Sequence, residues 1–178
     1  MSICITGTGS YIPELIKKNQ DFLDNIFLNT DGTNFKVSNE VIIKKFQAIT
    51  GIEERRYAKK NYNSSDLAFF AAEKAITDSQ INKESLDYII VAHNFGDVNY
   101  GTKEFDQLPS LAARVKYKLK INNPDCVCYD LIFGCPGWVE GVIQAQAFIK
   151  AGMAKRCLVI GAETLSRTFD ITDRDSMI

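Results

Sequence analysis

The sequence lacks an excess of charge of either sign, a long apolar run and a secretory leader. Its 21 basic and 22 acidic residues leave a net charge of −1, which argues against a surface built for nucleic acid or anionic membrane. No apolar run approaches the roughly 18 residues needed to cross a bilayer. The first residues, MSICI, lack the basic region and long apolar stretch of a signal peptide. We therefore expect a cytoplasmic protein with no nucleic-acid and no membrane partner.

Cysteine is sparse, and its spacing fits no common metal or redox motif. The five cysteines are an odd number with no Cys-x-x-Cys pair: Cys4, Cys126, Cys128, Cys135 and Cys157. With no leader, this pattern indicates reduced thiols rather than disulfides. A metal site made of Cys126, Cys128 and His93 would fit no zinc spacing. We expect buried core thiols at the first two positions and no metal.

Histidine occurs once, at His93, directly after an apolar run over residues 86–92. A lone histidine at a strand end could act as a general base or contact a substrate. The alternative, which we favour, is a hydrogen-bonded strand-end histidine or one that lines a pocket.

What the sequence does contain is typical of a globular α/β protein. Hydrophobic residues make up 46% of the 178 residues and charged residues 24%, which is enough for one sizeable core and a single domain over 1–178. Apolar patterning predicts strands over residues 3–8, 86–92, 126–133 and 156–161, and helices over 40–49, 65–79, 137–151 and from Pro109 onward. This alternation predicts a mostly parallel sheet with helices on both faces.

Three stretches have no clear periodicity. Residues 19–38 are polar and irregular, and residues 53–56 (EERR) are predicted to be a solvated or ion-paired loop. Residues 162–178 show no pattern and end on apolar residues, so we expect the natural protein to continue.

The segment YDLIFGCPGW (residues 129–138) carries the best candidate for chemistry. It is predicted to be a strand end, a tight turn holding Cys135, and a helix start. A helix N-terminus offers free N–H groups and a partial positive charge, both of which favour a thiolate. Gly134 permits an unusual backbone angle, Pro136 suits a first helical turn, and Gly137 would let a substrate approach closely.

Cys135 would lie beyond the carboxyl end of a parallel strand, where open α/β sheets bind ligands. The pattern alone leaves an alternative open, because a cysteine before a proline is more often a packed residue than a nucleophile. No histidine lies nearby in the sequence, so a base would have to come from elsewhere.

Several motifs in order resemble the β-ketoacyl-acyl-carrier-protein synthase III group of the thiolase superfamily. The resemblance covers essentially the whole chain. It rests on GTGSYIP (7–13), TGIEER (50–55), SDLA (65–68), LDYIIVA (86–92), PSLAA (109–113), GCPG (134–137), AG (151–152), LVIGAE (158–163) and DR (173–174).

This resemblance implies a thiolase-like, five-layered α/β/α/β/α fold of two similar halves, of which this chain is the first. It implies a homodimer that makes a 3-oxoacyl thioester from an acyl-CoA starter and malonyl-acyl carrier protein, in fatty-acid or polyketide-type biosynthesis. Cys135 would take the acyl group, and nearby backbone donors would form an oxyanion hole. No cofactor is implied, because acyl-CoA and the phosphopantetheine of acyl carrier protein are substrates.

The resemblance also assigns further residues and shows departures. Arg174 would contact the CoA nucleotide, Leu108 would gate the acyl pocket, and His93 is a weaker candidate for a substrate contact. Lys45 and Ile49 replace the family's usual tryptophan and arginine at the CoA platform, so a carrier-bound starter is expected as well as acyl-CoA. The histidine and asparagine that assist decarboxylation would belong to the second half.

Pro136 and Trp138 replace the common alanine and phenylalanine, and the 94–108 loop is longer than usual. We therefore expect a changed starter pocket.

Two alternatives remain open at this point. The full-length protein could transfer an acyl group to an oxygen or nitrogen acceptor without forming a carbon–carbon bond. The chain could instead be a catalytically incomplete structural or dimerisation fragment.

Overall fold

A computed structural model describes residues 2–177 as two compact units, where the sequence suggests one domain. The first unit comprises the stretch through Tyr11 together with Lys60–Thr164, and the second comprises Ile12–Lys59 together with the chain from Leu165 onward.

The first unit is built on a three-stranded parallel sheet in the order β6-β3-β7. β3 (Tyr88–His93) lies in the centre, between β6 (Val127–Ile132) and β7 (Cys157–Gly161). The register pairs Tyr88 with Val127 and with Cys157. β3 is buried from Ile89 onward, which explains its unbroken apolar sequence. Among the described residues, β6 and β7 form the two edges of this sheet.

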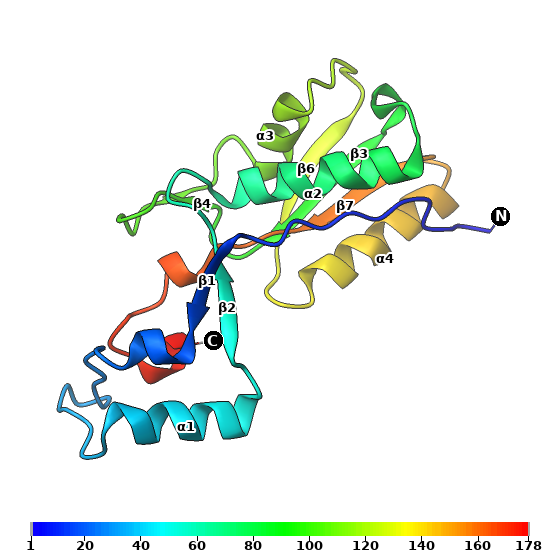
Figure 1. Ribbon diagram of the computed structural model, residues 1–178. Helices are drawn as coiled ribbons and strands as arrows, with labels where there is room; N and C mark the ends of the chain where they lie inside the picture. The colour runs from blue at the N-terminus through cyan, green and yellow to red at the C-terminus, as the bar shows by residue number, and fades with distance from the viewer. Residues whose placement is uncertain (1, 178) are drawn as a thin grey trace. The chain divides into compact units, whose positions relative to one another are not determined.

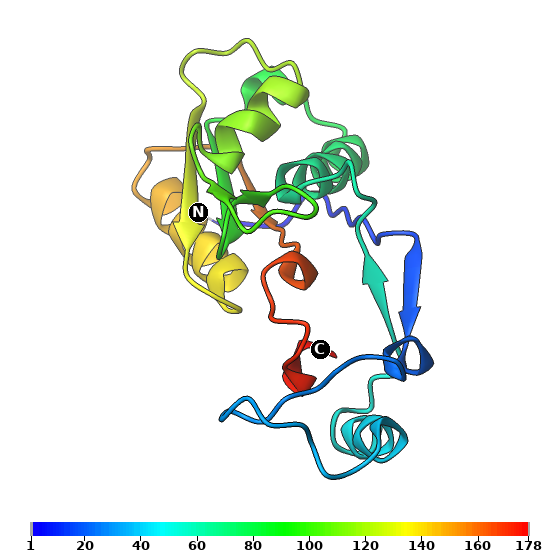
Figure 2. The same ribbon diagram turned by 90° about the vertical axis from the view of Figure 1, so that its left-hand side faces the viewer.

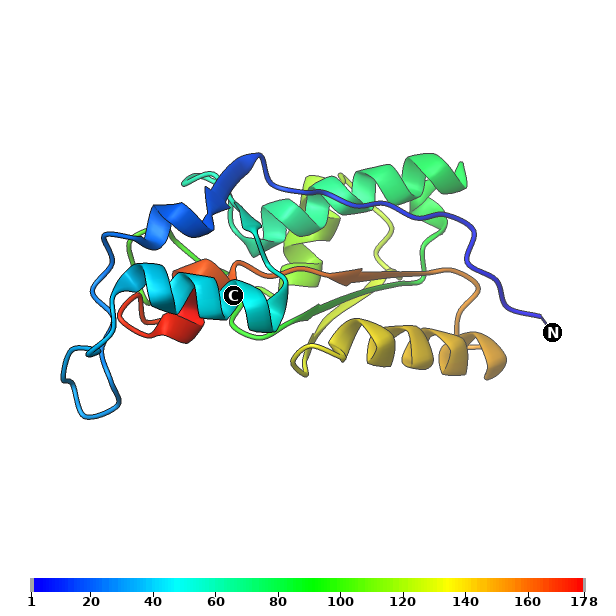
Figure 3. The same ribbon diagram turned by 60° about the horizontal axis from the view of Figure 1, so that its bottom comes forward.

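Helices cover both faces of this sheet (Figures 1 and 3), as predicted. α2 (Ser64–Ser79) and α3 (Leu111–Lys118) lie on one face, and α4 (Gly137–Lys150) lies on the other. The main core forms between the sheet and the first two helices: Ala68, Ala72, Leu86, Ile89, Val91, Leu111, Ala112, Val115, Leu119, Ile121, Cys126, Leu158 and Ile160. A short 3-10 turn, η2 (Lys83–Ser85), leads into β3. A two-stranded ribbon, β4 (Asp97–Val98) and β5 (Phe105–Asp106), follows it.

The prediction of a strand over residues 3–8 is wrong, because these residues carry no strand in the structure. The segment runs beside α2, where the Thr8 N–H donates to Asp78 Oδ2 at 2.8 Å. A groove of about 600 Å³ lies between this segment and β7. A strand needs a hydrogen-bonded neighbour, and among residues 2–177 none lies alongside this stretch.

The second unit contains a short antiparallel pair, seen side by side in Figure 2. β1 (Leu15–Lys18) pairs with β2 (Glu54–Tyr57), so the charged stretch predicted as a loop is largely a strand. The unit also holds α1 (Asn39–Thr50), which ends at Gly51 with φ of +69°, and the 3-10 turns η1 (Asn19–Phe22), η3 (Leu165–Arg167) and η4 (Arg174–Met177). Its small core consists of Phe22, Phe27, Ile42, Ile43 and Met177.

Candidate active site

Cys135 lies in the turn that joins β6 to α4, at the carboxyl edge of the parallel sheet, as the sequence predicts. Gly134 has φ of +75°, a backbone conformation that glycine adopts without strain. The Gly137 N–H closes the turn by donating to the Gly134 carbonyl at 3.0 Å. This turn leaves the Cys135 thiol exposed to solvent rather than packed in the core.

α4 begins two residues after Cys135 and runs for 14 residues, with Pro136 as its N-cap at φ of −81°. The first N–H groups of a helix have no partner in the helix and carry a partial positive charge. An anion at Cys135, whether a thiolate or an oxyanion formed next to it, would therefore be stabilised from the α4 side.

Gly137 has a different structural role from the one that the sequence pattern predicts. A Cβ added there would come within 3.1 Å of the Ala92 Cβ and 3.4 Å of the Phe133 Cβ. Gly137 is buried and lets the first turn of α4 pack closely on β3, so the prediction that it leaves room for a substrate is replaced by a packing role. Gly141, one turn further on, is tighter still, because its Cβ would lie 2.7 Å from Val159 Cγ1.

We expect Gly141→Ala to lower the free energy of unfolding by about 1–3 kcal/mol, because the added methyl group overpacks the α4–sheet contact. The better helix propensity of alanine offsets less than about 1 kcal/mol of this loss. Urea unfolding followed by circular dichroism measures the change. Gln146→Ala, on the exposed face of the same helix, is the control and should stay within about 0.5 kcal/mol of wild type. Equal stabilities of the two variants would contradict the close contact.

Cys135 differs from Cys128 and Cys157 in the sheet and from Cys126 just before β6. Cys135 and Cys4 are exposed, whereas Cys126 is buried and Cys128 and Cys157 are half-buried. Burial raises the pKa of the Cys128 thiol to about 12 and that of Cys157 to about 11, and it also raises the pKa of Cys126. Only the thiolate attacks electrophiles, and a raised pKa keeps the thiol protonated. We therefore expect these three cysteines to react slowly.

Iodoacetamide should therefore label Cys4 and Cys135 and spare the other three cysteines. A thiol with a pKa of about 11 is ionised in only about one molecule in a thousand at about pH 8. Peptide mass spectrometry of the alkylated native protein measures the order of labelling. Labelling of Cys128 or Cys157 as fast as Cys135 would contradict the burial described here, and denatured protein, in which all five should react, is the control.

His93 is buried and bonded at both ring nitrogens. Its Nδ1 accepts from the Gly96 N–H at 3.0 Å, so the other nitrogen carries the proton, and Nε2 lies 3.0 Å from Asp130 Oδ2. The side chain has no exposed surface. The ring therefore has no free nitrogen to offer a substrate, and the geometry is that of the hydrogen-bonded strand-end histidine.

Asp130, on β6, is the centre of this polar cluster, a role that no sequence pattern predicts. Besides His93, its carboxylate accepts from the N–H groups of Leu111 at 2.7 Å and Ala112 at 2.8 Å. A carboxylate at a helix N-terminus is favoured by the unpaired N–H groups. Asp130 thus ties the start of α3 and the end of β3 to the strand that leads to Cys135.

Two further polar residues lie at the same edge of the sheet. Glu163 follows β7 and accepts from the N–H groups of Asn94 at 2.6 Å and Thr164 at 3.1 Å. A Cβ built on Gly134 would lie 3.7 Å from Asn94 Oδ1, so the Asn94 amide adjoins the cysteine turn. Sequence reasoning missed Asn94 and Glu163, although each lies directly beyond a predicted strand, where the parallel-sheet rule places site residues.

The structure places the other expected site residues as follows. Leu108 precedes α3, is joined to Pro109 by a cis peptide bond, and is 86% exposed. Arg174 belongs to the second unit, where its guanidinium lies 5.3 Å from the centre of the Phe35 ring. Its side chain is half exposed. Lys45, at the altered platform position, is exposed on α1.

Residues 2–177 show no helix that is long and apolar enough to cross a membrane. Across the same residues, no three or more His, Cys, Asp or Glu side chains gather so that they could hold a metal ion. In the pairing of β3 with β6, His93 lies opposite Ile132, whereas Cys128 lies opposite Ile89. His93 and the partner of Cys128 are thus four residues apart along β3. The structure therefore does not bring His93 close to Cys128, as a metal site made of Cys126, Cys128 and His93 would require.

Comparison with known proteins gives one consistent family. A family model described as 3-oxoacyl-[acyl-carrier-protein (ACP)] synthase III matches residues 129–178, which include Cys135. The β-ketoacyl-[acyl-carrier-protein] synthase III 1 of Vibrio vulnificus (strain YJ016) is 38% identical over 174 residues, which are 98% of this chain and 48% of the relative. The synthase III of Neisseria gonorrhoeae (strain NCCP11945) is also 38% identical, with the same coverage.

Solved structures agree. The 3-oxoacyl-[acyl-carrier-protein] synthase III of Aquifex aeolicus VF5 superimposes with a TM-score of 0.75 at 33% identity, over 96% of this chain and 48% of that one. The priming β-ketosynthase of the R1128 polyketide pathway has a TM-score of 0.74 at 19% identity, over 96% and 44% of the two chains, and shows the fold alone. The chain spans about half the length of the curated relatives it matches.

Proposed function

The chain belongs to the β-ketoacyl-[acyl-carrier-protein] synthase III family, as its N-terminal half, and we propose that the full-length protein is a condensing acyltransferase. The observation that carries the proposal is the exposed Cys135 thiol at the β6–α4 turn, within the segment that the family model matches. The product would be a 3-oxoacyl thioester of acyl carrier protein, made for fatty-acid or polyketide-type biosynthesis.

The first proposed step is acyl transfer to Cys135. The thiolate attacks the thioester carbonyl of the starter, the bond from the acyl carbon to the carrier sulfur breaks, and the carrier leaves as a thiol after taking up a proton. The oxyanion that forms in between lies on the α4 side of the turn, where the helix N-terminus stabilises negative charge. The acyl group is then held on Cys135 as a thioester.

The second proposed step is condensation. Malonyl-acyl carrier protein loses carbon dioxide, and the resulting carbanion attacks the Cys135 thioester, so that a carbon–carbon bond forms and the Cys135 thiolate is released. The histidine and asparagine implied by the family resemblance for decarboxylation belong to the second half of the fold. His93 has neither exposure nor a free ring nitrogen for this work.

The proposed substrates are an acyl-CoA or acyl-carrier starter and malonyl-acyl carrier protein, with no bound cofactor. Arg174 is the proposed contact for the CoA nucleotide, and its side chain is half exposed, with Asp175 Oδ1 3.7 Å from its Nε. Leu108 is the proposed gate of the acyl pocket, and its side chain is free of the core. We also propose a homodimer that works in the cytoplasm, where the five free cysteines of the chain would stay reduced.

Release of carbon dioxide from carboxyl-labelled malonyl-acyl carrier protein tests this function in the full-length protein. Condensation predicts that labelled carbon dioxide and the 3-oxoacyl product appear together and that both depend on an acyl starter. An acyltransferase to oxygen or nitrogen would consume the starter without releasing carbon dioxide. A protein that binds these substrates but releases neither product would leave only the structural or dimerisation role.

A further inference from the structure

The segment between β3 and α3 contains a paired hairpin rather than an open loop. We call residues 97–108 the 97–108 hairpin. In it Asp97 lies opposite Asp106, and Val98 lies opposite Phe105. Two carboxylates directly across a pair of strands repel each other. The hairpin therefore needs a cation between them to hold this register.

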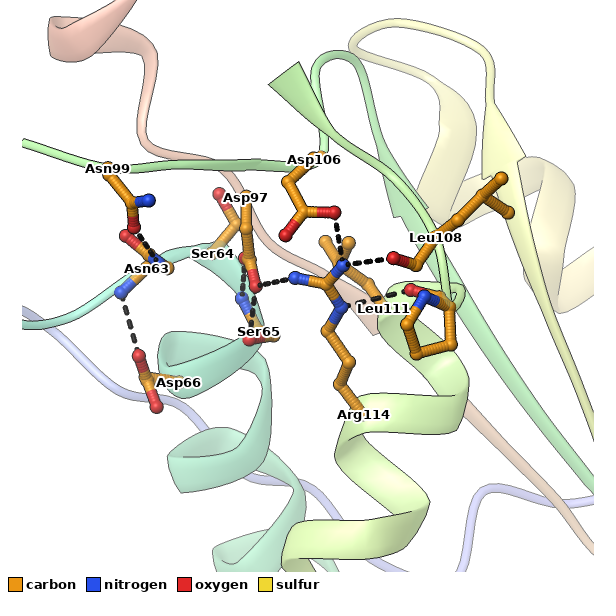
Figure 4. Close-up of polar contacts among 12 residues, drawn as sticks. Asn63, Ser64, Ser65, Asp66, Asp97, Asn99, Asp106, Leu108, Leu111 and Arg114 are labelled. Atoms are coloured by element: carbon orange, nitrogen blue, oxygen red, sulfur yellow. Dashed lines mark hydrogen bonds and ion pairs between the residues drawn. The ribbon is translucent and has the colours of Figure 1, made fainter. Parts of the chain in front are cut away.

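Arg114, on the first turns of α3, supplies that cation (Figure 4). One terminal nitrogen donates to Asp97 Oδ2 at 2.8 Å, and the other donates to Asp106 Oδ1 at 2.6 Å. The hydrogen bond from Arg114 lowers the pKa of Asp106, so this carboxyl stays ionised in the pair. A planar guanidinium can span two carboxylates at once, which a lysine ammonium does less well.

The same guanidinium also fixes the backbone at the end of the hairpin. It donates to the carbonyl oxygens of Leu108 at 3.0 Å and Pro109 at 2.9 Å. In Figure 4 the Leu108 carbonyl points toward Arg114 while its side chain points away. Arg114 therefore sets the direction in which the exposed Leu108 side chain projects.

The other end of the hairpin is held by buried groups. Asp97 is 4% exposed and accepts from the N–H of Ser65 at 2.7 Å and from its hydroxyl at 2.6 Å, at the first turn of α2. Just before it, the Gly96 N–H donates to His93. His93 in turn contacts Asp130 on the strand that leads to Cys135. The hairpin is thus attached at its start to the end of β3 and to α2, and at its end to α3.

We infer that Arg114 is a positioning residue that sets starter-chain selectivity by fixing the 97–108 hairpin and the direction of Leu108. This inference rests on the proposed function, because it takes Leu108 as a wall of the acyl pocket. Arg114 touches no substrate in this account. Its four hydrogen bonds join the parts of the hairpin that would otherwise move independently.

The test compares acetyl and octanoyl starters, each presented on CoA and on acyl carrier protein, in the full-length protein. The rate of Cys135 acylation is measured by intact-protein mass spectrometry. In Arg114→Met the ratio of octanoyl to acetyl rates should rise by about fivefold or more, because a loosened gate admits the longer chain. Asp106→Asn leaves the hydrogen bond from Arg114 to Asp97 in place. This variant should therefore shift the ratio in the same direction by less than Arg114→Met does.

Four further variants, one of them a double variant, separate selectivity from simple loss of stability. Arg114→Lys should restore most of the thermal stability lost in Arg114→Met but leave the ratio shifted, since lysine cannot hold both carboxylates and both carbonyls. Leu108→Ala should shift the ratio, and adding Arg114→Met to it should change the ratio little further, because both act on one wall. Arg156→Gln, an exposed arginine before β7, is the control and should leave the ratio unchanged.

The outcomes are distinct. Equal losses of both rates in Arg114→Met, with the ratio unchanged, would overturn the inference while leaving the proposed function in place. Additive shifts in the double variant would also overturn it. Failure of the wild-type protein to be acylated by any of the four starters would instead remove the proposed function, and the inference with it.

Discussion

Cys135→Ala in the full-length protein will reduce formation of the 3-oxoacyl product by about 10³-fold or more, because alanine cannot accept the acyl group. The loss should appear in kcat and not as weaker binding of the starter, since the thiol bonds to the substrate only as the reaction proceeds. Product formation from labelled malonyl-acyl carrier protein and a saturating starter measures it.

Cys4→Ala is the matched control, because Cys4 is the other exposed cysteine of the chain. It should keep full activity. Circular dichroism should show that both variants fold, since the Cys135 side chain is exposed and contributes little to packing. Product formation by Cys135→Ala within tenfold of wild type would remove Cys135 as the nucleophile.

Asp130→Ala should lower the free energy of unfolding by about 3–5 kcal/mol, the largest stability effect that we expect from a polar residue of the site. The change leaves the Leu111 and Ala112 N–H groups and the His93 ring without their acceptor. Buried donors that lose their partner keep the full cost of desolvation. Urea unfolding of wild type and variant, compared at the same chain length, measures the difference.

Asp130→Asn keeps one acceptor oxygen. Its loss in free energy of unfolding should be smaller than that of Asp130→Ala by about 1–2 kcal/mol. Asp125→Asn is the control, because Asp125 is exposed in the turn before β6, and it should stay within about 0.5 kcal/mol of wild type. A loss below about 1 kcal/mol in Asp130→Ala would show that the polar cluster does not hold α3 and β3 to β6.

The sequence predicts well those parts of the fold that are determined by residues close together in the chain. β3 is covered on both faces, so its residues read as an unbroken apolar run. α1 and α4 each end where a glycine adopts a positive φ, at Gly51 and Gly152. The position of Cys135 is predictable because a cysteine between an apolar run and a helical pattern has a definite place in a parallel sheet.

The parts that the sequence does not predict depend on distant partners. β1 and β2 are four residues each and contain exposed charges, and only their mutual pairing makes them strands. The reverse holds for residues 3–8, which have strand-like composition but no neighbouring strand among the described residues. A propensity for strand is a fit to a half-buried, paired surface, so it fails where no pair forms.

The polar network of the site depends on contacts across the fold in the same way. Asp130 lies 18 residues after Ala112, and Arg114 lies 17 residues after Asp97. Neither pair forms a motif, because each joins an early turn of α3 to a strand residue that only the packed fold brings close to it. Their placement explains how a short turn at Cys135 and an exposed hairpin can share one rigid support.

Acylation of Cys135 is measured most directly by peptide mass spectrometry of the full-length protein after incubation with acetyl-CoA or acetyl-acyl carrier protein. We expect one added acetyl group on the peptide that contains Cys135, removed by hydroxylamine as a thioester should be, and absent from Cys135→Ala. An acetyl group found elsewhere in a protein that turns over, with Cys135 unmodified throughout, would contradict it.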